Sequence, residues 1–166
     1  MAVLDVIQIG DRVLSSVARR IDTIGDRHKR LVDDLVETMY SSPGSVGIAA
    51  PQVGIAEAIF VLDVSGHKKT NLCHGLIVML NPELVSSSNP VVLREGCMSV
   101  PHLTGDVRRP SMVAMKGIDL SGNEITIETD AFEARALLHE FDHLNGKLFL
   151  DRVEGPHALF QRKRYL

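Results

Sequence analysis

The segment HEFDH, residues 139–143, constrains the fold of this chain more than any other part of the sequence. In an α-helix, residues four apart lie one above the other on the same face. His139 and His143 would therefore point their imidazoles toward one position, where they can hold a divalent metal ion. Glu140 lies about 100° around the helix from His139, so its carboxylate suits proton transfer better than metal ligation. The pattern predicts a metal-binding helix.

This helix is predicted to span residues 131–145 and to be largely buried. Asp130 is the expected N-cap, Glu133 its capping-box partner, and Gly146 the left-handed residue that follows the last turn. The alternative is an exposed helix with two unrelated histidines. An apolar flank argues against this alternative, because it indicates that the helix is buried. Buried imidazoles need partners, since an unpaired buried polar group costs about 1–3 kcal/mol. A bound metal ion would supply the partner. The flank consists of Ala134, Leu137, Leu138, Phe141 and Leu144.

A catalytic metal site usually needs a third protein ligand besides the two histidines. The patterns of two peptidase classes fail downstream: Phe149 stands where metzincins have their third histidine, and no acidic residue follows Glu154 to match the distant glutamate of thermolysin-like enzymes. The third ligand must therefore lie upstream. By position alone, Cys97 is as good a core residue as a ligand. The upstream candidates are His28, His67, Cys73, His74, Cys97 and His102.

The rest of the chain predicts an α+β fold in a single domain over residues 1–166. Short antiparallel strands come first and the metal helix follows, without regular β-α-β alternation. Pro82 is expected to limit the pairing available after it. We expect the strands to pack around a central metal-binding helix. Helical spacing is found over residues 27–41, strand composition over 57–65, 76–85 and 111–129, and a turn signal over 121–123.

Charge and hydropathy exclude several classes of partner. A net charge of -3 argues against a DNA-binding protein. No apolar run is long enough to span a membrane, and the first residues have no basic segment or cleavage signal, so we do not expect secretion. We therefore expect a cytoplasmic protein with no DNA or membrane partner. In such a reducing compartment, Cys73 and Cys97 are weighed as metal ligands, nucleophiles or core residues rather than as a disulfide.

Three separated segments resemble the signature motifs of the peptide deformylase family, of the bacterial and organellar type. The segment SVGIAAPQVG, residues 45–54, is similar to that family's glycine-alanine loop, which ends in a glutamine. The segment EGCMS, residues 95–99, resembles its cysteine motif, and HEFDHLNG, residues 139–146, its metal helix. The likeness extends from residue 3 to residue 152, and the motifs have the family's order and spacing.

By this resemblance, Cys97, His139 and His143 bind the metal ion. The family is associated with Fe²⁺ as its native ion, while Zn²⁺, which the ligand types also suit, and other divalent ions substitute for it. The resemblance implies that a metal-bound water would attack the formyl carbon of the formyl-methionine that begins a newly made polypeptide, with release of formate. Glu140 would then act as general acid and base.

The resemblance also assigns the residues around the metal ligands. The side-chain amide of Gln52 and the backbone N–H of Met98 would stabilise the oxyanion. Glu95 and Arg109 resemble the family's charged pair and are interpreted as a structural salt bridge. The predicted substrate-binding wall consists of Val46, Gly47, Leu93, Phe132 and Ala136.

Four residues depart from the family pattern and bear on substrate preference and rate rather than on the reaction. They are Ser45 in place of a glycine, Thr104 in place of an arginine, Arg135 in place of an apolar residue, and Leu138 in place of a glutamine. The apolar character of Leu138 has no explanation in the sequence.

The resemblance implies formyl-methionyl nascent polypeptides as partners, and the basic run Arg162 to Arg164 raises a weak expectation of ribosome contact. A zinc-dependent peptidase and a non-catalytic, metal-stabilised binding module are the alternatives. Glu140 favours an enzyme over a binding module, since a structural metal site needs no general base.

Overall fold

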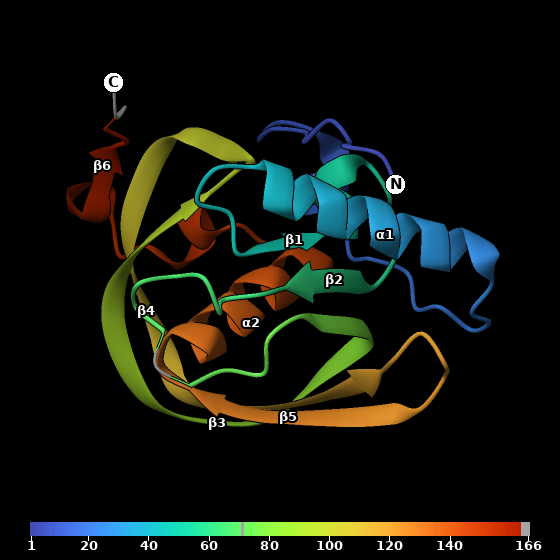
Figure 1. The fold of residues 1–166 in the computed structure, drawn as a ribbon. Coiled ribbons are helices and arrows are strands. Elements are labelled where there is room, and N and C mark those ends of the chain that lie inside the picture. Colours follow the sequence, from blue (N-terminus) through green and yellow to red (C-terminus); the bar gives the residue numbers. More distant parts are fainter. Residues whose placement is uncertain (71, 164–166) are drawn as a thin grey trace.

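The computed structural model describes residues 1–70 and 72–163, in which two helices accompany a six-stranded antiparallel sheet (Figure 1). The predicted α+β class is therefore confirmed. The sheet order is β1-β2-β3-β4-β5, and β6 adds to β4. The helices are α1 (Asp26–Ser41) and α2 (Ala131–Leu144). The strands are β1 (Gly47–Ala49), β2 (Ile59–Leu62), β3 (Ile77–Cys97), β4 (Val100–Ile118), β5 (Glu124–Asp130) and β6 (Leu159–Gln161).

Helix α2 lies at the centre of the molecule, as the sequence predicts, with β1 and β2 on one side and the curved β3–β4 ribbon on another (Figure 1). Strand β2 is buried on both faces because each face meets a different helix. Phe60 and Leu62 belong to the core around α2, whereas Ile59 and Val61 belong to the core under α1. This double burial explains why β2 is apolar throughout rather than alternating.

Strands β3 and β4 are far longer than the short strands predicted from the sequence, with 21 and 19 residues. The predicted end of the first strand at residue 85 is wrong. Pro82 does not stop the pairing, which continues with Glu83 opposite Lys116. The irregular step falls at Asn81, whose φ is 49° and whose side-chain amide bonds both backbone groups of Ile21. These two bonds hold a conformation that few non-glycine residues adopt.

The β3–β4 ribbon curves around α2 (Figure 1). Pro90 lies opposite Pro110 in the ladder, where neither residue has an N–H to donate. On its other edge, β3 pairs with β2 only through residues 77–80, and residues 83–94 are exposed. The buried face of the ribbon is carried by β4, whose Val113 and Met115 pack in the core around α2.

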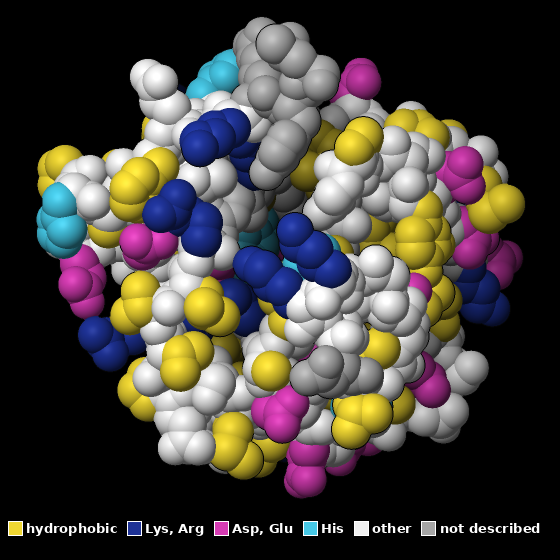
Figure 2. Space-filling view, turned by 60° about the vertical axis from the view of Figure 1, so that its left-hand side comes forward, with side chains coloured by type: hydrophobic (Ala, Val, Ile, Leu, Met, Phe, Trp, Pro, Cys, Tyr) yellow, Lys and Arg dark blue, Asp and Glu magenta, His cyan; other side chains and the backbone are white. Residues whose placement is uncertain are grey.

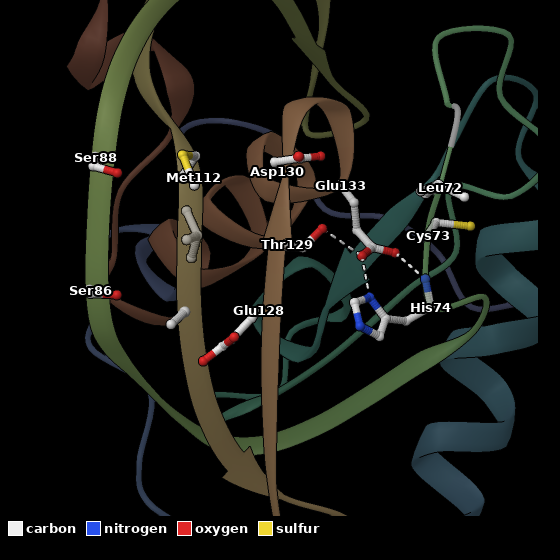
Figure 3. A pocket seen from close by; sticks show the side chains of 12 residues that line it. Leu72, Cys73, His74, Ser86, Ser88, Met112, Glu128, Thr129, Asp130 and Glu133 are labelled. Atoms are coloured by element: carbon white, nitrogen blue, oxygen red, sulfur yellow. Dashed lines mark hydrogen bonds and ion pairs between the residues drawn. The ribbon is translucent and has the colours of Figure 1, made fainter.

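The two ends of α2 differ in how well the sequence predicts them. Gly146 adopts the predicted left-handed conformation, with φ 69°. At the other end the predicted capping box is wrong, because the side chain of Asp130 makes no capping hydrogen bond. Glu133 instead accepts hydrogen bonds from the Thr129 hydroxyl at 2.8 Å and the His74 backbone N–H at 2.8 Å, and its carboxylate pairs with the His74 ring (Figure 3). Because these partners satisfy the hydrogen-bonding capacity of the Glu133 carboxylate, it does not act as the capping-box partner of Asp130.

Two further points concern the helices. Leu138 is packed in the core around α2, which gives the physical reason for an apolar residue next to the first metal-binding histidine. Within the described residues, neither helix combines the length and the apolar character that crossing a membrane requires.

Candidate metal centre

The candidate metal centre lies where α2 meets the tip of the β3–β4 hairpin. His139 and His143 project from one face of α2, and Cys97 is the last residue of β3. One ligand atom from each of the three residues lies within 4.8 Å of the others. The Cys97 Sγ atom is 3.4 Å from Nε2 of His143. In the described part of the chain, none of the other upstream candidates joins this group.

Glu95 fixes the orientation of the first histidine. Its Oε2 atom lies 2.9 Å from Nδ1 of His139, which leaves Nε2 of that ring for a metal. Arg109 donates to both carboxylate oxygens of Glu95, at 2.5 and 3.1 Å, and Arg135 donates at 2.7 Å. Burial alone would raise the pKa of Glu95, but the hydrogen bonds from His139 and Arg109 hold it well below its usual range. The carboxylate is therefore ionised.

The sequence interpretation of Glu95 as one half of a structural salt bridge covers only part of its contacts. The pair with Arg109 is present, and the contact with His139 is additional. One signal could have revealed it: Glu95 stands two residues before Cys97, and such residues share a strand face. The contact of Arg135 with Glu95 was also missed: Arg135 lines the cavity, and its buried guanidinium donates to this carboxylate.

Asp142 extends the same charged network on the far side of Arg109. Arg109 donates to it at 2.8 Å, and Arg152 donates to both of its carboxylate oxygens, at 2.6 and 2.7 Å. Since Asp142 is only 3% exposed, these two arginines balance its charge. The network ties α2 to β3 and β4 immediately behind the candidate ligands.

Glu140 is buried and packs against the backbone of β1. A Cβ atom placed at Gly47 would lie 2.6 Å from Oε1 of Glu140, so only glycine leaves room for this carboxyl group. The other oxygen, Oε2, has no hydrogen-bond partner. Burial raises the pKa of Glu140 to about 7, against the opposing effect of His139 and Arg109. A carboxyl group of this pKa can take up and release a proton near neutral pH.

Two hydrogen-bond donors lie beside Cys97. The side-chain nitrogen of Gln52 is 3.5 Å from Sγ of Cys97 and 3.2 Å from Oγ of Ser99. Its side-chain oxygen accepts from the backbone N–H of Ala49 at 3.0 Å, which fixes the orientation of the amide. Met98 occupies the turn between β3 and β4, and its backbone N–H makes no hydrogen bond within the described chain.

The residues of this site fit a divalent cation. A thiol and two imidazoles are the donor types found in mononuclear zinc and iron sites. Nδ1 of His143 and Oε2 of Glu140 are buried without partners, so the cluster is not satisfied by protein contacts alone. Burial lowers the pKa of His139, yet Cys97, Glu95 and Glu140 together raise it well above its usual range. The anionic groups around His139 therefore favour a positive charge between the three candidate ligands.

A cavity of about 580 Å³ opens beside the candidate ligands. Val46, Gly47, Phe132 and Ala136 line it, as do the departing residues Ser45, Thr104 and Arg135. Leu93 is not among the residues that line this cavity and is 44% exposed, so the structure does not bring it together with the other predicted wall residues. The guanidinium of Arg135 lies against the β3–β4 ribbon beside Leu93. It donates to the backbone carbonyls of Val91 and of Val107, the ladder partner of Leu93.

The site combines a cysteine and two histidines of one helix around a single position with a buried carboxyl group of raised pKa on the same helix. This combination is typical of single-metal hydrolases. The model of the Polypeptide deformylase family matches residues 3–158. The chain belongs to the peptide deformylase family, whose members use a divalent metal ion.

Individual relatives agree with this assignment. The peptide deformylase of Halothermothrix orenii is 45% identical over 92% of this chain and 95% of its own length. Peptide deformylase 1 of Clostridium acetobutylicum is 42% identical over 92% of this chain and 96% of its own. The crystal structure of a peptide deformylase from Legionella pneumophila superimposes with a TM-score of 0.85 at 36% identity, over 94% of this chain and 88% of that one. The chain is thus similar to these enzymes in sequence and fold.

Proposed function

We propose that this chain hydrolyses the formyl amide of N-terminal formyl-methionine in newly made polypeptides, with Glu140 as the group that moves the proton. The observation that carries the proposal is the placement of Glu140. Its carboxyl group packs against Gly47 of β1, it stands on the same helix as His139 and His143, and one of its buried oxygens has no partner. In the reaction, the C–N bond breaks, the formyl carbon gains the water oxygen, and the amine gains a proton.

Cys97, His139 and His143 would hold the divalent ion, and Glu95 would keep His139 in the ligating orientation. When bound, such an ion lowers the pKa of water and polarises a carbonyl group. Fe²⁺ is proposed as the native ion, with Zn²⁺ and other divalent ions as substitutes. The donor set by itself suits either metal.

Glu140 carries the proton steps. Its pKa of about 7 lets Oε2 accept a proton from the attacking water and then deliver that proton to the departing amine. Gln52 and Met98 supply the donors for the oxygen of the formyl group as it becomes negatively charged. The two N–H groups beside Cys97 are positioned before the reaction, so no reorganisation is needed when the charge develops.

The methionine side chain would enter the cavity between Val46, Phe132 and Ala136, with Gly47 beside it. These three side chains are apolar, which suits the thioether side chain of methionine. Actinonin, found in complex with the peptide deformylase of Synechococcus elongatus, is expected to bind in the same cavity and to compete with substrate.

The proposal is tested by incubating the anaerobically prepared, metal-loaded protein with a formyl-Met peptide and with its unformylated counterpart. We expect stoichiometric formate and free amine from the first peptide and no reaction with the second. Cleavage of internal peptide bonds would favour a zinc-dependent peptidase instead. Metal binding without either product would favour a non-catalytic binding module.

Three narrower points belong to the same proposal. Residues 1–166 form one catalytic domain. The enzyme works in the cytoplasm, where nascent chains emerge. The basic run that begins with Arg162 and Lys163 gives weak contact with the ribosome; its last residue, Arg164, lies outside the described residues.

A further inference from the structure

The mouth of the cavity carries more positive charge than the catalytic chemistry explains. Five basic residues line it, whereas its only carboxylates are those of Glu95 and Glu140, both buried. The chain as a whole has a net charge of -3, so this cluster is a local exception. Figure 2 shows Lys and Arg side chains on both sides of a hollow in which histidine is visible. The five basic residues are Lys69, Arg94, Arg135, Arg162 and Lys163.

Two of these cations are already neutralised. Arg135 is buried and bonded to Glu95. Arg94 bonds to Asp106 at 2.6 Å and stacks on the ring of Phe160 at 3.5 Å. The other three cations form no ion pair within the described chain. They are Lys69, Arg162 and Lys163, and we call them the basic rim.

Arg162 is the member of the basic rim that the fold places most firmly. Strand β6 pairs with β4, and immediately after it the backbone N–H of Arg162 donates to the carbonyl of His102 at 2.9 Å. The guanidinium of Arg162 then occupies the space that a Cβ atom at Gly96 would take. Because Gly96 directly precedes Cys97, this cation stands beside the candidate metal ligand although it comes from the other end of the chain.

The position of the basic rim relates it to a particular part of the substrate. If the methionine side chain fills the apolar wall formed by Val46, Phe132 and Ala136, the rest of the polypeptide must leave through the mouth of the cavity. The residues that follow formyl-methionine then pass the basic rim. Unpaired cations at such a position attract anionic side chains and raise the rate of encounter with them.

We infer that the basic rim, with Arg162 as its principal member, is a specificity determinant that favours aspartate or glutamate at the second and third positions of the substrate. The inference rests on the proposed function and deepens it. Each exposed ion pair is expected to change kcat/KM by about two- to fivefold. The effect should fall on KM rather than on kcat, because the contact is the same in the ground state and the transition state.

The test uses three amidated peptides of equal length: formyl-Met-Glu-Asp-Ser, formyl-Met-Ala-Ala-Ser and formyl-Met-Lys-Arg-Ser. Amidation removes the terminal carboxylate, which would otherwise act as an anion itself. We expect the acidic peptide to have the highest kcat/KM at low ionic strength, by about five- to tenfold over the neutral one, and the preference to weaken in salt. Arg162→Gln should reduce the acidic-to-neutral ratio by about threefold, and the double variant with Lys163→Gln should bring it close to one.

The control is Arg30→Gln, which makes the same change in net charge on the exposed surface of α1, outside the cavity, and should leave the ratio unchanged. Equal kcat/KM for acidic and neutral peptides in the unmodified enzyme would overturn the inference and leave the proposed function intact. An acidic preference that survives the double variant would also overturn it. Loss of ribosome binding with an unchanged peptide ratio would assign the basic rim to RNA and reject the inference. No formate from any peptide would overturn the proposed function and this inference together.

Discussion

Replacing Gly47 by alanine gives a direct test of whether the backbone of β1 positions the proposed proton carrier. The new Cβ atom would lie 2.6 Å from Oε1 of Glu140 and 3.0 Å from its Cγ and Cδ atoms. An ordinary contact begins at 3.4 Å, so the carboxyl group must move by the difference between 3.4 and 2.6 Å, which is 0.8 Å. Displacing a catalytic group by about 1 Å costs roughly 100-fold in rate. We therefore expect kcat to fall by about 30- to 100-fold.

The assay is formate release from a neutral formyl-Met peptide, with the metal content of each preparation measured in parallel. Gly66→Ala is the matched control, because a Cβ atom at Gly66 meets nothing within 4 Å. Both variants should bind metal as the unmodified protein does, since the atoms nearest to a Cβ at Gly47 belong to Glu140 and a Cβ at Gly66 meets no atom within 4 Å. If Gly47→Ala keeps the kcat of Gly66→Ala, the backbone of β1 does not determine the position of Glu140. A rise in KM alone would mean that the new methyl group obstructs substrate instead.

Three other predictions concern the carboxylates around the centre. Glu140→Ala should retain the metal and lose roughly 100- to 10,000-fold in kcat; formate release at full metal occupancy measures this, and near-normal activity would remove Glu140 from its proton-transfer role. Glu95→Gln should weaken metal binding by about 10- to 100-fold, which competition with a chelator measures. It should also destabilise the fold by about 3–5 kcal/mol, because it leaves Arg109 and Arg135 partly unpaired, and urea unfolding measures this second effect. The folded protein should also lose stability in acid. Burial raises the pKa values of Glu95 and Asp142, but bonds from His139, Arg109 and Arg152 lower them below their usual range, so their stabilisation is present above about pH 4 and declines as the pH falls below it. Urea unfolding of the metal-free protein between neutral and acid pH checks this, and Asp142→Asn should show a shallower decline.

The sequence predicts the metal helix well because its signals are local. The spacing of His139 and His143, the apolar flank and the left-handed Gly146 all depend on residues within one helical segment. Cys97 could not be chosen from spacing alone, because it reaches the centre through the turn between two long strands. Only the resemblance of its motif to a known family separated it from the other upstream candidates.

The missed features depend on partners that lie far away in the chain. The full length of β3 was missed because residues 83–94 are exposed on both faces and lack the alternation that marks a half-buried strand. The capping box was predicted from Asp130 and Glu133, but Glu133 pairs with His74, more than fifty residues upstream. Leu93 was placed in the cavity wall, where the long side chain of Arg135 reaches instead.

The exposed edge of β3 has a consequence for how the molecule behaves at high concentration. A long unpaired edge strand is usually a template on which another chain can add a strand. Here Pro90 has no N–H to offer, and Asn89 adopts a φ of 55° that no regular ladder accommodates. Pro90 and Asn89 therefore interrupt this template, so the described edge is a poor surface on which copies of the chain could assemble into larger sheets.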